Sequence, residues 1–247
     1  MSRLETAKVV VVMPALNAAR TLESTVSAIP EVDEVIIVDD RSTDETVQLA
    51  RSLPVHLIWH PHNVGYGGNQ KTCYLEALQR DADVVVMLHP DGQYEPALIP
   101  ELVEPILRGE ADMVLGSRFA EPGLARREGM PLWKFLANRA LTTIENAVLG
   151  TDLTEMHTGY RAYSRRLLLT VPFLRNSLGF GFDSQMIMQA SELGFRIAEV
   201  PARSRYFEEA SSVGFKTSVK YGLHTLLSAA RLVLHRRGIV RSRLFTT

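Results

Sequence analysis

Short apolar runs rich in β-branched residues alternate with helical patterns through the first 120 residues, and this alternation restricts the possible folds more than any other feature. The segment KVVVVM (Lys8–Met13) is apolar without interruption after its first residue, which is typical of a strand buried on both faces. Further strands of this kind are predicted at Glu34–Val38, Val55–Trp59, Asp83–Leu88 and Ala111–Leu115. Helices are predicted between them at Ala19–Ile29, Glu45–Ser52, Asn69–Arg80 and Pro96–Leu107. This order predicts an α/β fold with a mostly parallel sheet flanked by helices on both faces.

The second half of the chain is less regular. Helical patterns are found at Pro131–Leu149 and Asp183–Leu193. Short strand patterns are found at His157–Tyr163 and Ile197–Arg203, and a charged loop is expected at Leu124–Met130. We expect one domain over residues 1–215, followed by an amphipathic, basic C-terminal helix and tail over residues 216–247.

Composition excludes several classes of protein. A chain of 247 residues with 46% hydrophobic residues can bury a large core, and its net charge of −1 gives no reason to expect a nucleic-acid partner. Its one cysteine, Cys73, cannot form an internal disulfide, so a reducing compartment is the default. No apolar run approaches the roughly 18–20 residues needed to span a bilayer. We expect a cytoplasmic protein, with a peripheral position on the inner face of the membrane as the alternative.

Polar side chains follow several of the predicted strands at the point where each strand ends. In parallel sheets, ligands bind beyond the carboxyl ends of the strands. Each of these residues also has a structural alternative as a turn or helix-cap residue, with Asn17, Ser42 and Thr43 as candidate caps. The polar residues at the strand ends are Asn17, Asp39, Asp40, His89, Asp91 and Arg118.

Seven short motifs, taken in order, resemble glycosyltransferase family 2, and within it the dolichol- and polyprenol-phosphate sugar synthases. The resemblance covers about residues 8–205 and implies a Rossmann-like GT-A fold, a UDP- or GDP-linked sugar donor, and a divalent metal, Mg²⁺ or Mn²⁺. The motifs are VVMPALNAARTLE, VDDRSTDET, HNVGYGGNQKT, HPDGQYEP, GSRF, HTGYRAYSR and GFGFDSQ.

The donor site is predicted from residue chemistry together with this resemblance. Asp39 or Asp40 is placed to accept hydrogen bonds from ribose hydroxyls or a base N–H. Glycines such as Gly68 allow close approach of the backbone, and Lys71, in the first turn of the helix predicted to follow, suits a phosphate. A glycine-rich turn without a ligand is the alternative. The predicted nucleotide-sugar site comprises Pro14, Ala15, Asn17, Asp39, Asp40, Gly68, Lys71, Pro90 and Asp91.

The segment His89-Pro90-Asp91 departs from the family pattern, which has Asp-x-Asp at this place and uses it to hold a metal against the diphosphate. Asp91 corresponds to the second aspartate and is the predicted metal ligand. His89 replaces the first aspartate; because Mn²⁺ accepts imidazole, His89 is a second candidate ligand. The alternatives are that His89 only hydrogen-bonds the donor, or that the segment is a simple turn.

The predicted catalytic residues are Asp91, Arg118, Arg161 and Asp183. In the resembling synthases, the arginines of these motifs are linked to the acceptor phosphate and the sugar diphosphate, which the planar guanidinium matches well. Asp183 either caps a helix or acts on the acceptor. A phosphate acceptor needs no strong base, whereas a hydroxyl acceptor needs a carboxylate, and Asp183 or Asp152 is then the candidate.

The predicted C-terminal helix has an apolar face and a basic end, so it suits a membrane interface. The alternative is that the apolar face packs on its own domain or on a second subunit, forming a homo-oligomer. The preceding RYFEEASS segment (Arg205–Ser212) is expected to be a loop that covers the site. The apolar face comprises Val219, Leu223, Leu226, Leu227, Ala230, Val233 and Leu234.

These features favour an inverting glycosyltransferase that moves a sugar from a nucleoside-diphosphate sugar to a polyprenyl phosphate at a membrane surface. One alternative is transfer to a soluble hydroxyl acceptor. Another is a nucleotide-sugar-binding protein with weak or no catalysis. A dinucleotide-dependent oxidoreductase is disfavoured, because PALNAA follows the first strand where a GxGxxG turn would be required.

Overall fold

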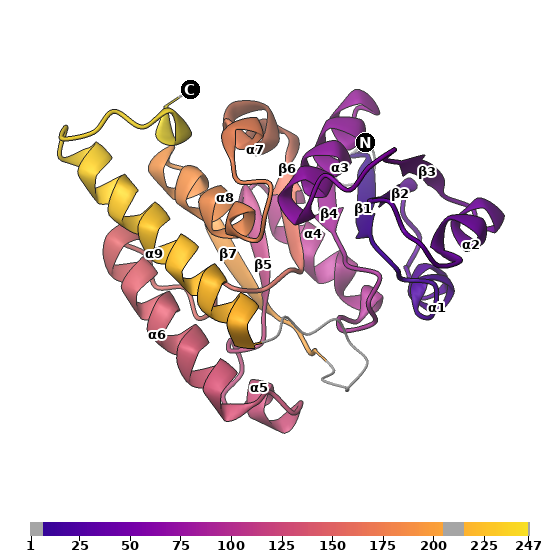
Figure 1. The fold of residues 1–247 in the computed structure, drawn as a ribbon, viewed down its shortest axis with the longest axis horizontal. Coiled ribbons are helices and arrows are strands. Elements are labelled where there is room, and N and C mark those ends of the chain that lie inside the picture. The colour runs from indigo at the N-terminus through magenta and orange to yellow at the C-terminus, as the bar shows by residue number, and fades with distance from the viewer. Residues whose placement is uncertain (1–6, 205–214, 247) are drawn as a thin grey trace.

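The computed structural model describes residues 7–204 and 215–246, and its described strands form one seven-stranded sheet (Figure 1). The strand order is β3-β2-β1-β4-β6-β5-β7, and every neighbouring pair is parallel except the two that involve β6. The predicted fold class is therefore confirmed. The strands are β1 (Val9–Ala15), β2 (Glu34–Asp39), β3 (His56–Trp59), β4 (Val84–Met87), β5 (Met113–Ser117), β6 (Arg161–Ser164) and β7 (Ile197–Pro201).

Helices cover both faces of this sheet. Longer helices are α3 (Tyr66–Gln79), α4 (Ile99–Leu107), α6 (Leu132–Leu149), α8 (Gly181–Glu192) and α9 (Phe215–Arg236). Shorter ones are α1 (Leu22–Ser27), α2 (Thr46–Ser52), α5 (Leu124–Arg127) and α7 (Arg165–Thr170), with 3₁₀ turns η1 (Pro96–Leu98), η2 (Phe173–Arg175) and η3 (Arg243–Phe245). One core lies under α3, α7, α8 and α9, and the other lies under α1, α2 and α4.

The two cores explain why the strands have uninterrupted apolar sequences. In β1, Val10 and Val12 belong to one core, whereas Val11 and Met13 belong to the other. Because successive strand residues point to opposite faces, a sheet covered on both sides needs apolar residues at every position. Because neighbouring strands such as β1, β2 and β4 run parallel, their carboxyl ends lie at the same edge of the sheet.

Local details differ from the sequence prediction near the first two strand ends. Asn17 does not cap α1; it has φ of 52°, its backbone N–H donates to Ser42 Oγ, and its Oδ1 accepts the Thr43 N–H. Neither Ser42 nor Thr43 caps α2, where Asp44 instead accepts the backbone N–H of Thr46. Burial would raise the pKa of Asp44, but its hydrogen bonds with Thr46 and Ala19 hold that pKa below its ordinary value.

Two predicted loops contain helical residues. The helix predicted to begin at Asn69 begins at Tyr66, so Gly67 and Gly68 lie in its first turn. The charged segment Leu124–Met130 contains α5. In this helix Leu124 is buried, whereas the arginines face the solvent. The predicted covering loop Arg205–Ser212 lies outside the described residues.

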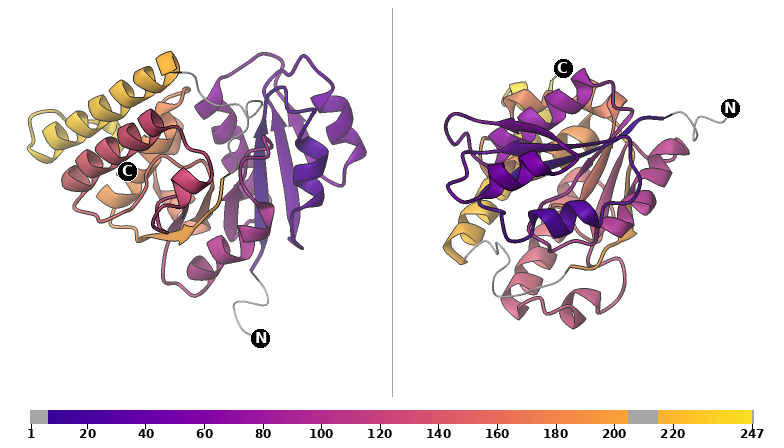
Figure 2. Two further views of the ribbon diagram at one scale, coloured as in Figure 1. Left: turned by 90° about the horizontal axis from the view of Figure 1, so that it is seen from below. Right: turned by 90° about the vertical axis from the view of Figure 1, so that its right-hand side faces the viewer.

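The face of the C-terminal helix α9 that meets the protein is mixed, because it buries the polar Thr225 and also the apolar Leu232. It packs on α6 and α8, and α6 and α9 lie side by side (Figures 1 and 2). Thr225 is buried and its hydroxyl lies 2.9 Å from that of Ser184. Leu223 and Leu227, from the predicted apolar face, are 57% and 67% exposed. The alternative that this face packs on its own domain is therefore wrong for these two leucines.

None of the helices in residues 7–204 and 215–246 combines the length and the apolar character that crossing a bilayer requires. The division of the chain at residue 215 stays a prediction.

We expect Gly67→Ala to destabilise the fold. A Cβ atom at Gly67 would lie 2.3 Å from the Ser177 carbonyl oxygen and 2.8 Å from Phe182 Cβ, so α3 and α8 would have to separate. The free energy of unfolding, measured by urea denaturation, should fall by about 1–3 kcal/mol. Gly222→Ala in α9 is the matched control, because its new Cβ meets only Leu141 at an ordinary 3.5 Å. That variant should gain about 0.5–1 kcal/mol. Equal losses in both variants would contradict the packing argument.

Candidate active site

A cleft of about 1350 Å³ opens at the carboxyl-end edge of the sheet. One wall is formed by the carboxyl ends of the strands and the segments that follow them: Pro14–Leu16 at the end of β1, Asp40 after β2, His89–Asp91 after β4 and Arg118 after β5. The opposite wall comes from α6, the beginning of α8, and α9. Residues distant in the sequence therefore share one concave surface, as expected for a parallel sheet.

Asp40 organises the loop that follows β3. Its carboxylate accepts the backbone N–H groups of Val64 at 2.8 Å and Gly65 at 3.0 Å, and it lies 3.0 Å from His60 Nδ1. Gly65 has φ of 86°, and a Cβ there would lie 2.7 Å from the Leu178 carbonyl oxygen. Asp40 therefore borders the cleft while holding a loop that only glycine can complete.

Asp39 is placed differently from its neighbour. It is 1% exposed and does not line the cleft, and its Oδ1 accepts the Ser42 N–H. Its Oδ2 is buried and has no hydrogen-bond partner among the described residues. Asn69, which does line the cleft, likewise has a buried Oδ1 without a described partner. Two buried acceptors near the end of β2 are thus available to an N–H or O–H donor.

His89 and Asp91 both line the cleft. The His89 ring stacks on Tyr66, with centroids 5.6 Å apart, and its Nε2 lies 3.3 Å from the Tyr66 hydroxyl. Gly159 makes room for this ring, because a Cβ there would lie 2.9 Å from His89 Cδ2. Asp91 Oδ1 accepts the backbone N–H of Gln93 at 3.0 Å. The glycine of the HTGYR motif therefore has a steric role toward the unusual histidine.

Asp183 lies in the first turn of α8, on the cleft wall, without capping the helix. The hydroxyl of Tyr66 donates to its Oδ2 at 2.7 Å, and Gln70 donates to its Oδ1 at 3.2 Å. Burial, and then the negative charge of Asp183, raise the pKa of the Tyr66 hydroxyl well above its ordinary value. Tyr66 therefore stays protonated and remains a hydrogen-bond donor to the carboxylate.

Arg118 forms a buried ion pair with Glu155. The Glu155 carboxylate is fully buried and accepts the Arg118 guanidinium, the Arg118 backbone N–H and the Asn138 amide. Burial would raise the pKa of Glu155, but the positive charge and hydrogen bonds of Arg118 hold it below its ordinary value. Lys134, beside Arg118 in the cleft, has a pKa lowered by burial and by that same positive charge. Arg118 and Lys134 are therefore two basic groups close to each other in the cleft, and the charge of Arg118 is paired with Glu155.

Not every predicted site residue faces the cleft. Arg161 is 1% exposed, and its guanidinium donates to the carbonyl oxygens of Met156, Thr158 and Asp183 beneath the cleft. Lys71 donates to the Asn176 carbonyl oxygen. Their roles in binding or catalysis stay predictions. The predicted residues that line the cleft are Pro14, Ala15, Asp40, His89, Pro90, Asp91, Arg118 and Asp183, and those that do not are Asn17, Asp39, Gly68, Lys71 and Arg161.

The sequence prediction missed several cleft residues because they lie in helices. Tyr221 lies in α9, and its hydroxyl is 2.7 Å from His157 Nδ1, within hydrogen-bond distance. Lys134 lies in the first turn of α6. One signal was present: Tyr221, Thr225 and Ser228 recur at helical spacing and form a hydroxyl-bearing face. The missed residues include Tyr66, Asn69, Trp133, Lys134, Tyr221 and His224.

Comparison with known proteins identifies the family and agrees with the fold. The family model described as "Glycosyl transferase family 2" matches residues 10–171, more than half of the chain. The undecaprenyl-phosphate mannosyltransferase of Micrococcus luteus is 31% identical over 204 residues, covering 78% of this chain and 82% of its own. The UDP-N-acetylglucosamine–dolichyl-phosphate N-acetylglucosaminyltransferase of Methanococcus voltae is 28% identical over 230 residues, covering 85% and 90%.

A solved structure resembles the whole chain. Glucosyl-3-phosphoglycerate synthase from Mycobacterium tuberculosis, in complex with Mn²⁺, UDP and glucosyl-3-phosphoglycerate, superposes with a TM-score of 0.67. The match is 24% identical and covers 96% of this chain and 82% of that one. Because the sequence identity is below 25%, this similarity supports a shared fold alone.

We expect Glu155→Gln to weaken the fold in a pH-dependent way. Because the folded pKa of Glu155 lies below the ordinary 4.5, its ion pair stabilises the protein fully above about pH 4.5, and this contribution disappears as the pH falls through the folded pKa. At pH 7 the variant should lose about 3–5 kcal/mol of unfolding free energy, because Arg118 is left buried without its counter-charge.

The measurement is urea denaturation from pH 7 to pH 3, with Glu121→Gln as control. Glu121 pairs with Arg127 on the surface, where both side chains are half exposed, so that change should cost less than about 1 kcal/mol. A Glu155→Gln deficit that does not shrink below about pH 4.5 would contradict the assignment.

Proposed function

Because the chain belongs to glycosyltransferase family 2, we propose that it transfers a sugar from a UDP- or GDP-linked donor to a polyprenyl phosphate, with inversion at the anomeric carbon. The observation that carries this proposal is the cleft itself, whose lining combines the carboxylate of Asp91 with the basic side chains of Arg118 and Lys134. The names of the matched relatives from Micrococcus luteus and Methanococcus voltae support a polyprenyl-type phosphate as acceptor.

The donor side of the proposal rests on the end of β2. A nucleoside offers ribose hydroxyls and base N–H groups, and these need acceptors. Asp39 Oδ2 and Asn69 Oδ1 are buried acceptors without described partners, so binding a nucleoside here would satisfy groups that otherwise cost free energy. These unpartnered oxygens therefore support a role for Asp39 in binding the nucleotide of the sugar donor, although Asp39 does not itself line the cleft.

A divalent metal fits this cleft only when it is shared with the donor. Within the described residues, no group of three or more histidine, cysteine, aspartate or glutamate side chains comes together. Mg²⁺ and Mn²⁺ are commonly held by one or two carboxylates together with substrate phosphates. Asp91 suits this, with His89 as the further candidate, whereas the Asp40 carboxylate already accepts two backbone N–H groups. When bound, the ion would neutralise charge on the leaving diphosphate.

The proposed reaction is a direct displacement. An oxygen of the acceptor phosphate attacks the anomeric carbon, the bond from that carbon to the diphosphate oxygen breaks, and the nucleoside diphosphate leaves with the bonding electrons. The positive charges of Arg118 and Lys134 reduce the electrostatic repulsion between the acceptor phosphate and the donor diphosphate, so the two can lie close together. The acceptor oxygen is already anionic, so no side chain has to remove a proton.

A soluble hydroxyl acceptor is the second candidate, favoured by the placement of Asp183. This carboxylate lies on the cleft wall, held by Tyr66 and Gln70, where it could accept a hydroxyl proton. The solved relative bound to glucosyl-3-phosphoglycerate shows that a protein of this fold binds a soluble product. The two reactions differ in that transfer to a hydroxyl requires a base, whereas transfer to a phosphate does not.

A peripheral position on a membrane would give the cleft access to a lipid phosphate. The helices α6 and α9 line the cleft and also expose apolar side chains on their outer faces. Leu132 and Leu136 of α6 are each 57% exposed, like Leu223 of α9, and Leu227 is 67% exposed. Neighbouring apolar side chains on two adjacent helices suit insertion at a bilayer interface beside the cleft.

We expect Asp91→Ala to abolish sugar transfer while leaving the fold intact, since Asp91 is partly exposed at the cleft and is the proposed ligand to the ion that neutralises the diphosphate. The measurement is the rate at which nucleoside diphosphate is released from UDP- and GDP-sugars in the presence of Mn²⁺. It is made both with and without polyprenyl phosphate. Release that depends on polyprenyl phosphate supports the proposed acceptor, and donor binding without release would indicate a sensor. Wild-type turnover by Asp91→Ala would remove Asp91 from the reaction.

We expect Leu227→Gln to weaken binding to anionic liposomes by about tenfold, because a leucine side chain buried in the bilayer contributes about 1.5–3 kcal/mol. Leu169→Gln in α7 is the matched control, since Leu169 is 62% exposed and α7 packs mainly on α3 and β6. Co-sedimentation with liposomes gives the measurement. Equal sedimentation of both variants and the wild type would exclude this face as the membrane contact.

A further inference from the structure

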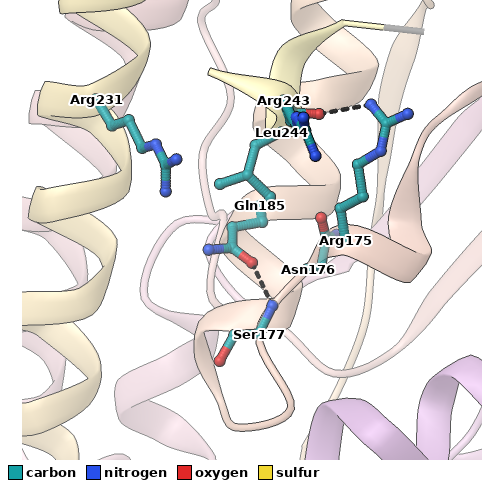
Figure 3. Close-up of a pocket in the computed structure, with 7 residues that line it drawn as sticks. All are labelled: Arg175, Asn176, Ser177, Gln185, Arg231, Arg243 and Leu244. Atoms are coloured by element: carbon teal, nitrogen blue, oxygen red, sulfur yellow. Dashed lines mark hydrogen bonds between the residues drawn. The ribbon is translucent and has the colours of Figure 1, made fainter. Parts of the chain in front are cut away.

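A second pocket, of about 430 Å³, lies outside the cleft and is lined by three arginines (Figure 3). The arginines come from three separate elements: Arg175 ends η2, Arg231 lies in α9, and Arg243 begins η3. Ser177 borders both this pocket and the cleft, so the two sites adjoin at this residue. The remaining lining residues are Asn176, Gln185 and Leu244.

The frame of this pocket is fixed by hydrogen bonds, some at the surface and some buried. Arg175 donates to the carbonyl oxygens of Arg243 at 2.7 Å and Thr246 at 2.6 Å, which holds the C-terminal segment against η2. Asn176 and Gln189 exchange two amide hydrogen bonds, and Gln189 also donates to the Leu244 carbonyl oxygen at 2.8 Å. The C-terminal residues therefore fold back to complete a defined cavity.

The charges around the pocket are not balanced. None of its lining residues is acidic, and the guanidinium groups of Arg231 and Arg243 form no hydrogen bond or ion pair within the described residues. Elsewhere on the surface the arginines find acids, as Arg236 does with Glu192 at 2.7 Å. Figure 3 shows the Arg231 guanidinium extending from α9 toward Gln185. Like charges gathered around one cavity repel each other unless an anion is bound among them.

We propose that this pocket binds a phosphate group, as a second anion site separate from the catalytic cleft. A phosphate offers three or more acceptor oxygens to guanidinium groups approaching from different directions, and the planar fork of arginine matches pairs of these oxygens. Ser177 adds a neutral hydroxyl to the lining. The site does not depend on the proposed sugar transfer, because none of the three arginines lines the cleft.

The phosphate has two possible sources, a soluble phosphate compound or the headgroup of a membrane lipid. Leu227 lies one helical turn before Arg231 and is 67% exposed, and Leu178, which follows Ser177, is 58% exposed. Exposed leucines adjoining lining residues suit a site at a membrane surface. The phosphate chemistry is common to both sources, so the experiment has one arm for each.

The test compares Arg231→Gln/Arg243→Gln with Arg237→Gln/Arg241→Gln in the full-length protein. Both double variants remove two positive charges near the C-terminus, but Arg237 and Arg241 are exposed residues outside the pocket lining. Arg175 is left unchanged because it holds the chain fold. Binding of inorganic phosphate is measured by calorimetry, and binding to vesicles is measured by co-sedimentation with phosphatidylglycerol or phosphatidylcholine. Nucleotide-sugar affinity, measured in parallel, should be the same in all three proteins.

We expect the pocket variant to bind one of these phosphate sources about tenfold more weakly than wild type, while the control variant changes less than about twofold. A loss seen with inorganic phosphate assigns a soluble ligand, and a loss seen only with phosphatidylglycerol vesicles assigns a lipid headgroup. If the two double variants behave alike in both assays, only net charge matters and the proposal is overturned.

Discussion

The buried guanidinium of Arg161 connects the parts of the molecule that form the floor of the cleft. A cation removed from water must be compensated by hydrogen bonds or by an opposite charge. Arg161 meets this requirement through three carbonyl oxygens and through Asp183, whose carboxylate lies 3.5 Å away. Burial disfavours the charged form, but Asp183 together with Tyr163, Tyr66 and Tyr221 more than offsets this and raises the pKa of Arg161. The segment before β6 and the beginning of α8 are therefore held together by one charge.

This arrangement extends to the reacting side of the cleft. Because Asp183 is fixed by Arg161, it also fixes Tyr66, and Tyr66 supports the ring of His89. The cleft residues contributed by β4, α3 and α8 thus share one hydrogen-bonded and stacked network. A residue that lies below the surface can in this way set the position of residues that face the ligand, without contacting the ligand itself.

The orientation of α9 has the widest consequences for the surface of the protein. Its hydroxyl-bearing face contacts α8, so Leu223 and Leu227 are left on the outside, whereas Leu232 is buried in the core and Tyr221 helps to form the cleft wall. The segment after α9 then folds back, and Leu244 and Phe245 are buried against the core. The same C-terminal region therefore contributes to the cleft, to an apolar outer face and to the arginine-lined pocket.

The sequence by itself determined the α/β architecture, the strands buried on both faces and the edge where the site lies. These follow from local patterns, because burial on two faces requires apolar residues at every strand position, and strand ends then bring residues such as Asp40, Asp91 and Arg118 together. The tertiary structure alone decided which polar groups face the cleft, the antiparallel insertion of β6 between β4 and β5, and the outward direction of Leu223 and Leu227. The physical reason is that these outcomes depend on partners far away in the chain. The Arg161 side chain is buried because Asp183 supplies an opposite charge beside it. The hydroxyls of α9 face inward because they form hydrogen bonds with Ser184 and Gln185 of α8.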